Sequence, residues 1–207
     1  MTARRSSAIA LMAALLLLGG CGASLWPKPP PQPELFTLDG GASAVIAAPA
    51  PGTQTRPTLI VATPRAASGY DTSRIAYRRR ALEIEYFAYA RWVDAPAQML
   101  APLIVDALQR SGSFAAVVPA PTSAAAELRL DTELIRLLQE FGAQPSRVHL
   151  TLRAVLIDTA RHRVIATREF DLSEVAPSDD PYGGVVAAQR AVQRMLPDLA
   201  GFCAASL

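Results

Sequence analysis

Three long segments near the middle of the chain constrain the fold most, because apolar and polar residues alternate along them. They are Glu127–Leu138, Arg147–Asp158 and Val164–Leu172. Alternation with period two is typical of strands buried on one face. Short connections at residues 141–145 and 159–162 separate the three segments and have the composition of hairpin turns. The pattern therefore predicts an antiparallel meander with one face packed and the other exposed to water.

Two further segments have helical rather than strand periodicity. In the first we expect Asp94 as N-cap, Pro96 in the first turn and Gly112 just past the end. The second is predicted to start at Asp180 and Pro181. Their apolar stripes are Leu100, Leu103, Ile104, Ala107 and Leu108, and Val185, Ala188, Val192, Met195, Leu196 and Leu199. Each stripe predicts one buried helix face.

Shorter strand patterns complete the expected order of elements. They lie at Glu34–Leu38, Thr58–Thr63, Ile75–Arg79, Leu82–Tyr86 and Phe114–Val118. The order of strands, helix, strands and helix predicts an α+β fold, in which a mostly antiparallel sheet carries two helices packed on one face. We expect a single periplasmic domain over residues 34–207.

The first twenty residues are predicted to be a signal peptide that is removed. Arg4 and Arg5 precede an apolar run over residues 8–18, which is too short to span a bilayer. The end of the run, Leu-Leu-Gly-Gly-Cys21, resembles a lipobox. We therefore expect cleavage before Cys21, which would carry S-diacylglyceryl and N-acyl chains. Two or three such chains hold a protein firmly on a membrane.

Residues 21–33 are expected to act as a tether between this anchor and the domain. Their Pro-rich part, from Leu25 to Pro33, disfavours helix and favours a semi-rigid extended spacer. By resemblance to enterobacterial lipoproteins, in which Asp after the lipidated cysteine favours inner-membrane retention, Gly22 indicates the outer membrane. Lipidation of Cys21 leaves Cys203 without an intramolecular partner, and we interpret Cys203 as a small buried residue.

Charge and motifs exclude several classes of function. Removing Arg4 and Arg5 from the 20 basic residues leaves 18, against 18 acidic residues, so the mature protein is near neutral and nucleic-acid binding is not indicated. The only histidines, His149 and His162, have no further His or Cys at ligand spacing, and no nucleophile elbow or phosphate-binding loop is present. We therefore expect no catalytic residue, no metal and no cofactor beyond the lipid on Cys21.

One cluster is not explained by alternation, and it is the candidate surface for docking a partner. Its residues are Tyr77, Arg78, Tyr86, Tyr89, Arg91 and Trp92. Tyr, Trp and Arg are the residue types enriched at interface hot spots. The alternative is that Trp92 and the tyrosines belong to the core or its rim while the arginines are solvated. Contact of the run Arg78-Arg79-Arg80 with anionic lipid head groups is a further alternative, although three charges make a weak patch.

Four short motifs resemble the ABC-type transport auxiliary lipoproteins, a family that includes the PqiC lipoproteins working beside MCE proteins. They are Glu34-Leu-Phe-Thr-Leu, Ile75-Ala-Tyr-Arg, Leu82-Glu-Ile-Glu-Tyr and Tyr89-Ala-Arg-Trp-Val-Asp-Ala-Pro. The resemblance spans most of the mature chain. Phe36, where an aromatic pair is more usual, and Pro102 inside the helix depart from the family pattern.

The resemblance implies a non-enzymatic role in lipid transport between the two membranes, with energy from a separate ATPase. The lipoprotein would sit at the periplasmic face of the outer membrane and dock an MCE-domain protein, and whether it forms a homo-oligomer stays open. One alternative is a structural lipoprotein for outer-membrane or envelope assembly. Another is a periplasmic hydrolase, which would require a cleft with perturbed titratable residues.

Overall fold

Three long strands form the centre of the computed structural model, which describes residues 31–41 and 56–207. They are β7 (Leu128–Glu140), β8 (Arg147–Asp158) and β9 (Arg163–Val175). Both ladders, β7 with β8 and β8 with β9, are antiparallel and run the full length of β8. The predicted meander is confirmed, and its strands lie within one compact unit, Pro33–Leu207.

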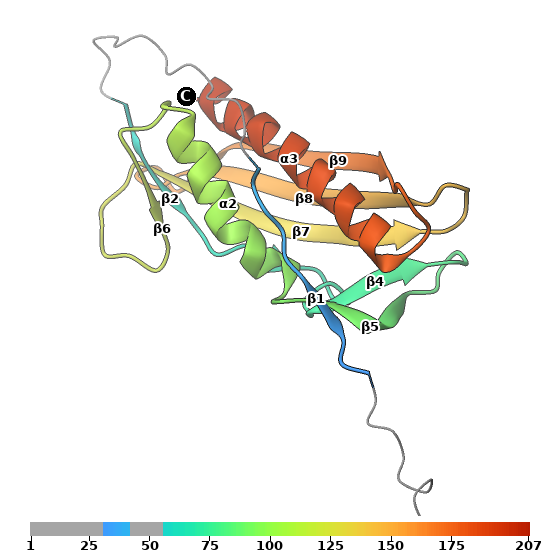
Figure 1. Ribbon diagram of the computed structural model, residues 1–207. Helices are drawn as coiled ribbons and strands as arrows, with labels where there is room; N and C mark the ends of the chain where they lie inside the picture. Colours follow the sequence, from blue (N-terminus) through green and yellow to red (C-terminus); the bar gives the residue numbers. More distant parts are fainter. Residues whose placement is uncertain (1–30, 42–55) are drawn as a thin grey trace, which may run out of the picture. The chain divides into compact units, whose positions relative to one another are not determined.

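The other edge of β7 is shared by three short parallel partners, because β7 is longer than each of them. These are β2 (Thr58–Val61), β3 (Arg65–Ala66) and β4 (Arg74–Arg78). Beyond them lie β6 (Ala116–Pro119) next to β2, β5 (Glu85–Trp92) next to β4, and β1 (Glu34–Phe36) next to β5. The result is one sheet of nine strands whose longest ladders are antiparallel (Figure 1).

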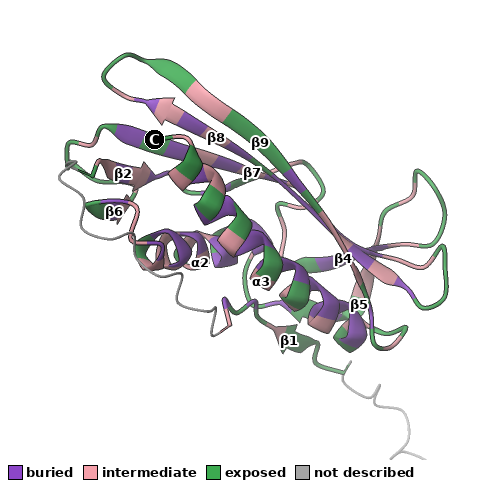
Figure 2. Cartoon of the chain, turned by 90° about the horizontal axis from the view of Figure 1, so that it is seen from above, coloured by how far each residue is buried: buried purple, intermediate pink, exposed green. Residues whose placement is uncertain are grey.

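Two helices, α2 (Pro96–Arg110) and α3 (Pro181–Ala205), cover one face of this sheet. Figure 2 shows both on the same side, with buried residues along the helix sides that face the strands. The predicted apolar stripes supply much of the core, which includes Leu100, Ile104, Leu108, Val192, Met195 and Leu199 at 0% exposure. The expected α+β class with two helices on one face is confirmed. Among the described residues, no helix is long and apolar enough to cross a membrane.

The prediction of the helix start is confirmed for α3 but not for α2. Asp180 caps α3 as predicted, because its carboxylate accepts a 2.7 Å hydrogen bond from the Gly183 N–H. The prediction for α2 was wrong by one residue. There the N-cap is Ala95, which has no side-chain oxygen, and Asp94 instead accepts a 2.7 Å bond from the Ala95 N–H.

One strand prediction was wrong in its position. Residues 79–84 form the connection between β4 and β5, and the strand starts only at Glu85. Leu82 has φ +68° and is fully exposed, so the alternation of Leu82, Ile84 and Tyr86 does not mark a buried face. Strand β3 was missed because two residues are too few to show a period. The other boundaries moved by three residues at most.

The cysteine predictions fall on two different parts of the chain. Cys203 is a free thiol at 0% exposure, and burial raises its pKa to about 12, as expected for a small core residue. The signal peptide, Cys21 and the tether up to residue 30 lie outside the described residues, so they stay predictions.

Candidate functional site

The six predicted docking residues lie on two paired strands but not on one surface. Tyr77 and Arg78 belong to β4, and the other four belong to β5. The antiparallel register pairs Arg74 with Arg91 and Ala76 with Tyr86, so β5 contains extra residues between these pairs. Such an irregularity changes which residues of β5 face the helices. The structure therefore divides the six between the two faces of the sheet.

Tyr77 and Trp92 lie on the face covered by the helices. Trp92 is 4% exposed and lines a very small cavity together with Ile75 and Leu137. Tyr77 is 9% exposed, and its hydroxyl donates a 2.8 Å hydrogen bond to Glu85. That hydrogen bond, together with burial, raises the pKa of Tyr77. These two residues are part of the core and cannot contact a partner directly, which corrects the expectation for them.

Arg78, Tyr86, Tyr89 and Arg91 lie on the opposite face, which no helix of the described structure covers; we call it the open face. The Tyr86 ring stacks under the Arg74 guanidinium, 3.7 Å from its centroid, and its hydroxyl donates to the Gly69 carbonyl at 2.9 Å. Arg78 is half-buried and forms a 2.6 Å ion pair with Glu140. Contacts inside the domain therefore hold Arg78 and Tyr86 in place.

The most exposed members of the cluster, Tyr89 and Arg91, adjoin apolar residues that the sequence did not single out. Strand β1 runs parallel to β5 and places Leu35 beside Arg91. Leu35, Tyr89 and Val93 are 64%, 58% and 54% exposed, while the alternate residues Ala90 and Trp92 are buried. We call Leu35, Tyr89, Arg91 and Val93 the β1–β5 patch. Only the pairing of β1 with β5 reveals it, since 54 residues separate Leu35 from Tyr89.

A polar network lies on the open face over β4, β7, β8 and β9. Glu140 lies between Arg78 and His149, whose Nε2 is 3.0 Å from the carboxylate. Arg136 forms a 3.0 Å ion pair with Asp171, which also accepts a 2.8 Å hydrogen bond from the Thr151 hydroxyl. Burial lowers the pKa of His149, as does the neighbouring Arg136, and these effects outweigh the opposing influence of Glu140.

This network has the chemistry of a structural ion-pair lattice rather than of a reaction centre. Each carboxylate already accepts a hydrogen bond from a guanidinium group, so none is free to act as a general base. Within residues 31–41 and 56–207, no three His, Cys, Asp or Glu side chains are grouped so that they could hold a metal ion. The described part of the chain thus offers surfaces for contact, and we describe no catalytic constellation in it.

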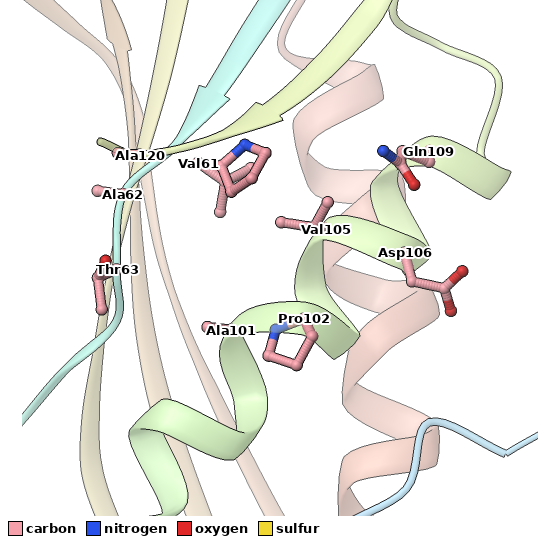
Figure 3. Close-up of a pocket in the computed structure, with 10 residues that line it drawn as sticks. Val61, Ala62, Thr63, Ala101, Pro102, Val105, Asp106, Gln109 and Ala120 are labelled. Carbon is pink, nitrogen blue, oxygen red and sulfur yellow. The ribbon is translucent and has the colours of Figure 1, made fainter. Parts of the chain in front are cut away.

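A groove of about 380 Å³ lies between α2 and the ends of β2 and β6, well away from the β1–β5 patch. Figure 3 shows its apolar lining, which includes Val61, Ala62, Ala101, Pro102 and Val105. The alanines leave space that longer side chains would fill. None of the six candidate residues lines this groove.

Comparisons with known proteins identify the family of the chain and solved structures with a similar fold. The model of the family described as ABC-type transport auxiliary lipoprotein component matches residues 36–200. A crystal structure of protein XCC0632 from Xanthomonas campestris is similar with TM-score 0.69 and 24% identity, over 84% of this chain and 96% of that chain. A crystal structure of an uncharacterized protein has TM-score 0.63 and 12% identity, over 83% and 99%. A search of curated proteins found no match.

Proposed function

The chain belongs to the family of ABC-type transport auxiliary lipoprotein components, and we propose that it docks the periplasmic component of such a transporter at the outer membrane. The partner in this proposal is an MCE-domain protein, and the cargo is phospholipid or another hydrophobic molecule. The lipoprotein itself would do no chemistry, since a separate ATPase supplies the energy.

The β1–β5 patch is the observation that carries the docking proposal. Three large apolar side chains and an arginine are exposed together on a rigid pair of strands. Exposed apolar side chains grouped in this way mark interaction sites more often than isolated ones do, and Tyr and Arg are enriched among hot-spot residues. Trp92, buried directly behind the patch, keeps β5 in place.

The proposed anchor is the acylated Cys21, joined to the domain by a Pro-rich tether. Gly22 supports placement at the outer membrane rather than the inner membrane. Fractionation of envelopes on a density gradient tests this placement. We expect the wild-type chain in the outer-membrane fraction and loss of a Cys21→Ala variant, which cannot be acylated, from that fraction. Recovery of the wild type with inner-membrane markers would overturn the outer-membrane part of the proposal.

Affinity purification from crosslinked envelopes tests the docking function. The tagged full-length chain is compared with a Tyr89→Ala/Arg91→Ala variant, and partners are identified by mass spectrometry. Val164→Ala is the matched control, because Val164 is similarly exposed, at 56%, but lies on β9. We expect an MCE-domain protein with the wild type and with the control, and its loss from the patch variant at equal protein abundance.

Two outcomes would contradict the proposal. Recovery of only cell-wall or assembly proteins would favour the alternative, a structural lipoprotein of the envelope. Equal recovery of the MCE-domain protein with the patch variant would show that docking uses another surface, such as the α2 groove.

A further inference from the structure

The connection between β4 and β5 ends in an exposed apolar tip. Leu82, with φ +68°, is fully exposed, and Ile84 is exposed two residues later. A non-glycine residue at positive φ is uncommon and costs conformational energy. The turn is closed by a 3.3 Å hydrogen bond from the Glu83 N–H to the Arg80 carbonyl. This backbone directs a large aliphatic side chain into solvent, away from the core.

Basic and aromatic groups surround the tip. The Arg79 guanidinium lies 5.2 Å from the centroid of the Tyr77 ring and 5.8 Å from that of Phe141. Arg80 is exposed and pairs with Glu83 within the turn. An aliphatic tip flanked by arginines fits the boundary between lipid head groups and acyl chains, where apolar groups insert and cations stay with the phosphates.

The direction of β1 places this tip at the end of the domain from which the tether leaves. Because β1 is parallel to β5, with Glu34 beside Ala90 and Phe36 beside Trp92, the chain before Glu34 runs towards the start of β5. The start of β5 is the β4–β5 connection. Figure 1 shows β1 beginning on the side of the sheet to which that connection extends.

The length of the tether keeps this end of the domain close to the bilayer. Pro33 comes twelve positions after Cys21, and an extended chain spans at most about 3.3–3.6 Å per residue, so the reach is about 40 Å. A tether of this length limits how far the tip can move from the bilayer, which raises the effective concentration of the tip at the membrane surface. A tip that binds lipid only weakly would therefore be bound for much of the time.

We infer that the β4–β5 tip, with Leu82 and Ile84 as its apolar part and Arg79 as its cation, inserts into the head-group layer of the membrane that holds the anchor. The inference rests on the proposed acylation of Cys21 and goes beyond it by giving the domain an orientation. With the tip on the membrane, β5 runs from the membrane towards the β1–β5 patch, whose first β5 residue, Tyr89, comes five residues after Ile84. A partner would then be held near the lipid that it delivers or accepts.

The experiment reconstitutes the full-length acylated lipoprotein into phosphatidylethanolamine and phosphatidylglycerol vesicles. A Leu82→Cys variant is labelled with the environment-sensitive fluorophore NBD, and the vesicles contain doxyl-labelled lipid as quencher. The native thiols do not compete, because Cys203 is buried and Cys21 is acylated in this proposal. Val164→Cys is the control. Val164 follows the β8–β9 turn, which lies beside the Leu128 end of β7, whereas β4 pairs with the Glu140 end.

We expect blue-shifted emission and at least two-fold quenching for the label at position 82, and neither change at position 164. An unshifted and unquenched label at position 82, in protein that floats with the vesicles, would overturn the inference and leave the anchor intact. Protein that does not float would overturn the anchor and the inference with it. A blue shift of the NBD emission that is seen only after an envelope protein is added would overturn the inference and show that the tip binds a protein partner instead.

Discussion

Tyr89 and Trp92, three residues apart on β5, point to opposite faces of the sheet. Tyr89 is 58% exposed on the open face, and Trp92 is 4% exposed in the core beneath the helices. Both were predicted to dock a partner, but only Tyr89 is placed to do so. Their separation gives a direct way to distinguish loss of docking from loss of folding.

Truncation of these two residues should affect stability very differently. We expect Trp92→Ala to lower the free energy of unfolding by about 3–5 kcal/mol, since it leaves a cavity in the core. Tyr89→Ala should change it by about 0.5 kcal/mol or less, because surface substitutions rarely do more. Urea unfolding followed by circular dichroism measures both. Equal destabilisation by the two variants would contradict the assignment of the faces.

Two glycines of α3 should respond in opposite directions to alanine. A Cβ on Gly183 would collide with the backbone carbonyl of Ser178, whereas one on Gly201 meets nothing within 4 Å. We expect Gly183→Ala to cost about 1–3 kcal/mol through steric strain. Gly201→Ala should stabilise by about 0.5–1 kcal/mol, since alanine is the better helix former. Thermal unfolding compares them, and a stabilised Gly183→Ala would show that the turn before α3 adjusts freely.

The stability of the domain should depend on pH through His149. Burial and Arg136 lower its pKa in the folded state, so the unfolded chain takes up a proton more readily. This contribution to stability is fully present above the unfolded pKa of about 6.5 and is lost as the pH falls from there towards the lowered folded pKa. We therefore expect the urea midpoint to decline between pH 7.5 and 5. The decline should be shallower in His149→Gln, whose amide can still donate to Glu140.

The charges around His149 define the control for this measurement. Arg78 and Arg136 act against its protonation, while Glu140 and Asp171 favour it. The pKa values of both carboxylates are lowered, so they titrate mainly below this pH range. His162→Gln, in the connection between β8 and β9, is the control for replacing a histidine at another position. Identical slopes in all three proteins would rule out His149 as the source of the pH dependence.

The Cys203 thiol should be inert in the folded protein. Burial raises its pKa to about 12, so almost no thiolate exists at pH 8. We expect no reaction with a thiol-specific disulfide reagent under native conditions and complete reaction in urea. The Cys21→Ala variant restricts the signal to this one thiol. Rapid native labelling would contradict the burial of Cys203, because only an accessible free thiol reacts.

Local periodicity was enough to predict the class of the fold. The meander of β7, β8 and β9 and the buried stripes of α2 and α3 follow from patterns that repeat many times along the chain. A repeated pattern is reliable because every turn or residue pair gives the same indication. The cap at Asp180 was predictable for a related reason, since the acceptor and the N–H it binds are three residues apart.

The candidate surface could be predicted only in part. The composition of residues 77–92 indicated Tyr and Arg at an interface, but it could not show which side chains face outward. That depends on the extra residues of β5 opposite β4, which reverse the alternation between Tyr86 and Arg91. The exposed position of Leu82 was hidden in the same way, because a turn and a strand can share one alternating pattern.

The amino-acid sequence by itself therefore determined the α+β class, the two helix faces, the long strands and the family resemblance, all of which depend on neighbours within a few residues. The tertiary structure alone decided that Leu35 and Val93 join Tyr89 and Arg91, and that Trp92 does not. The physical reason is that strand pairing and sheet faces are set by contacts between distant segments. Their burial energy is shared by the whole core, so no single segment encodes it.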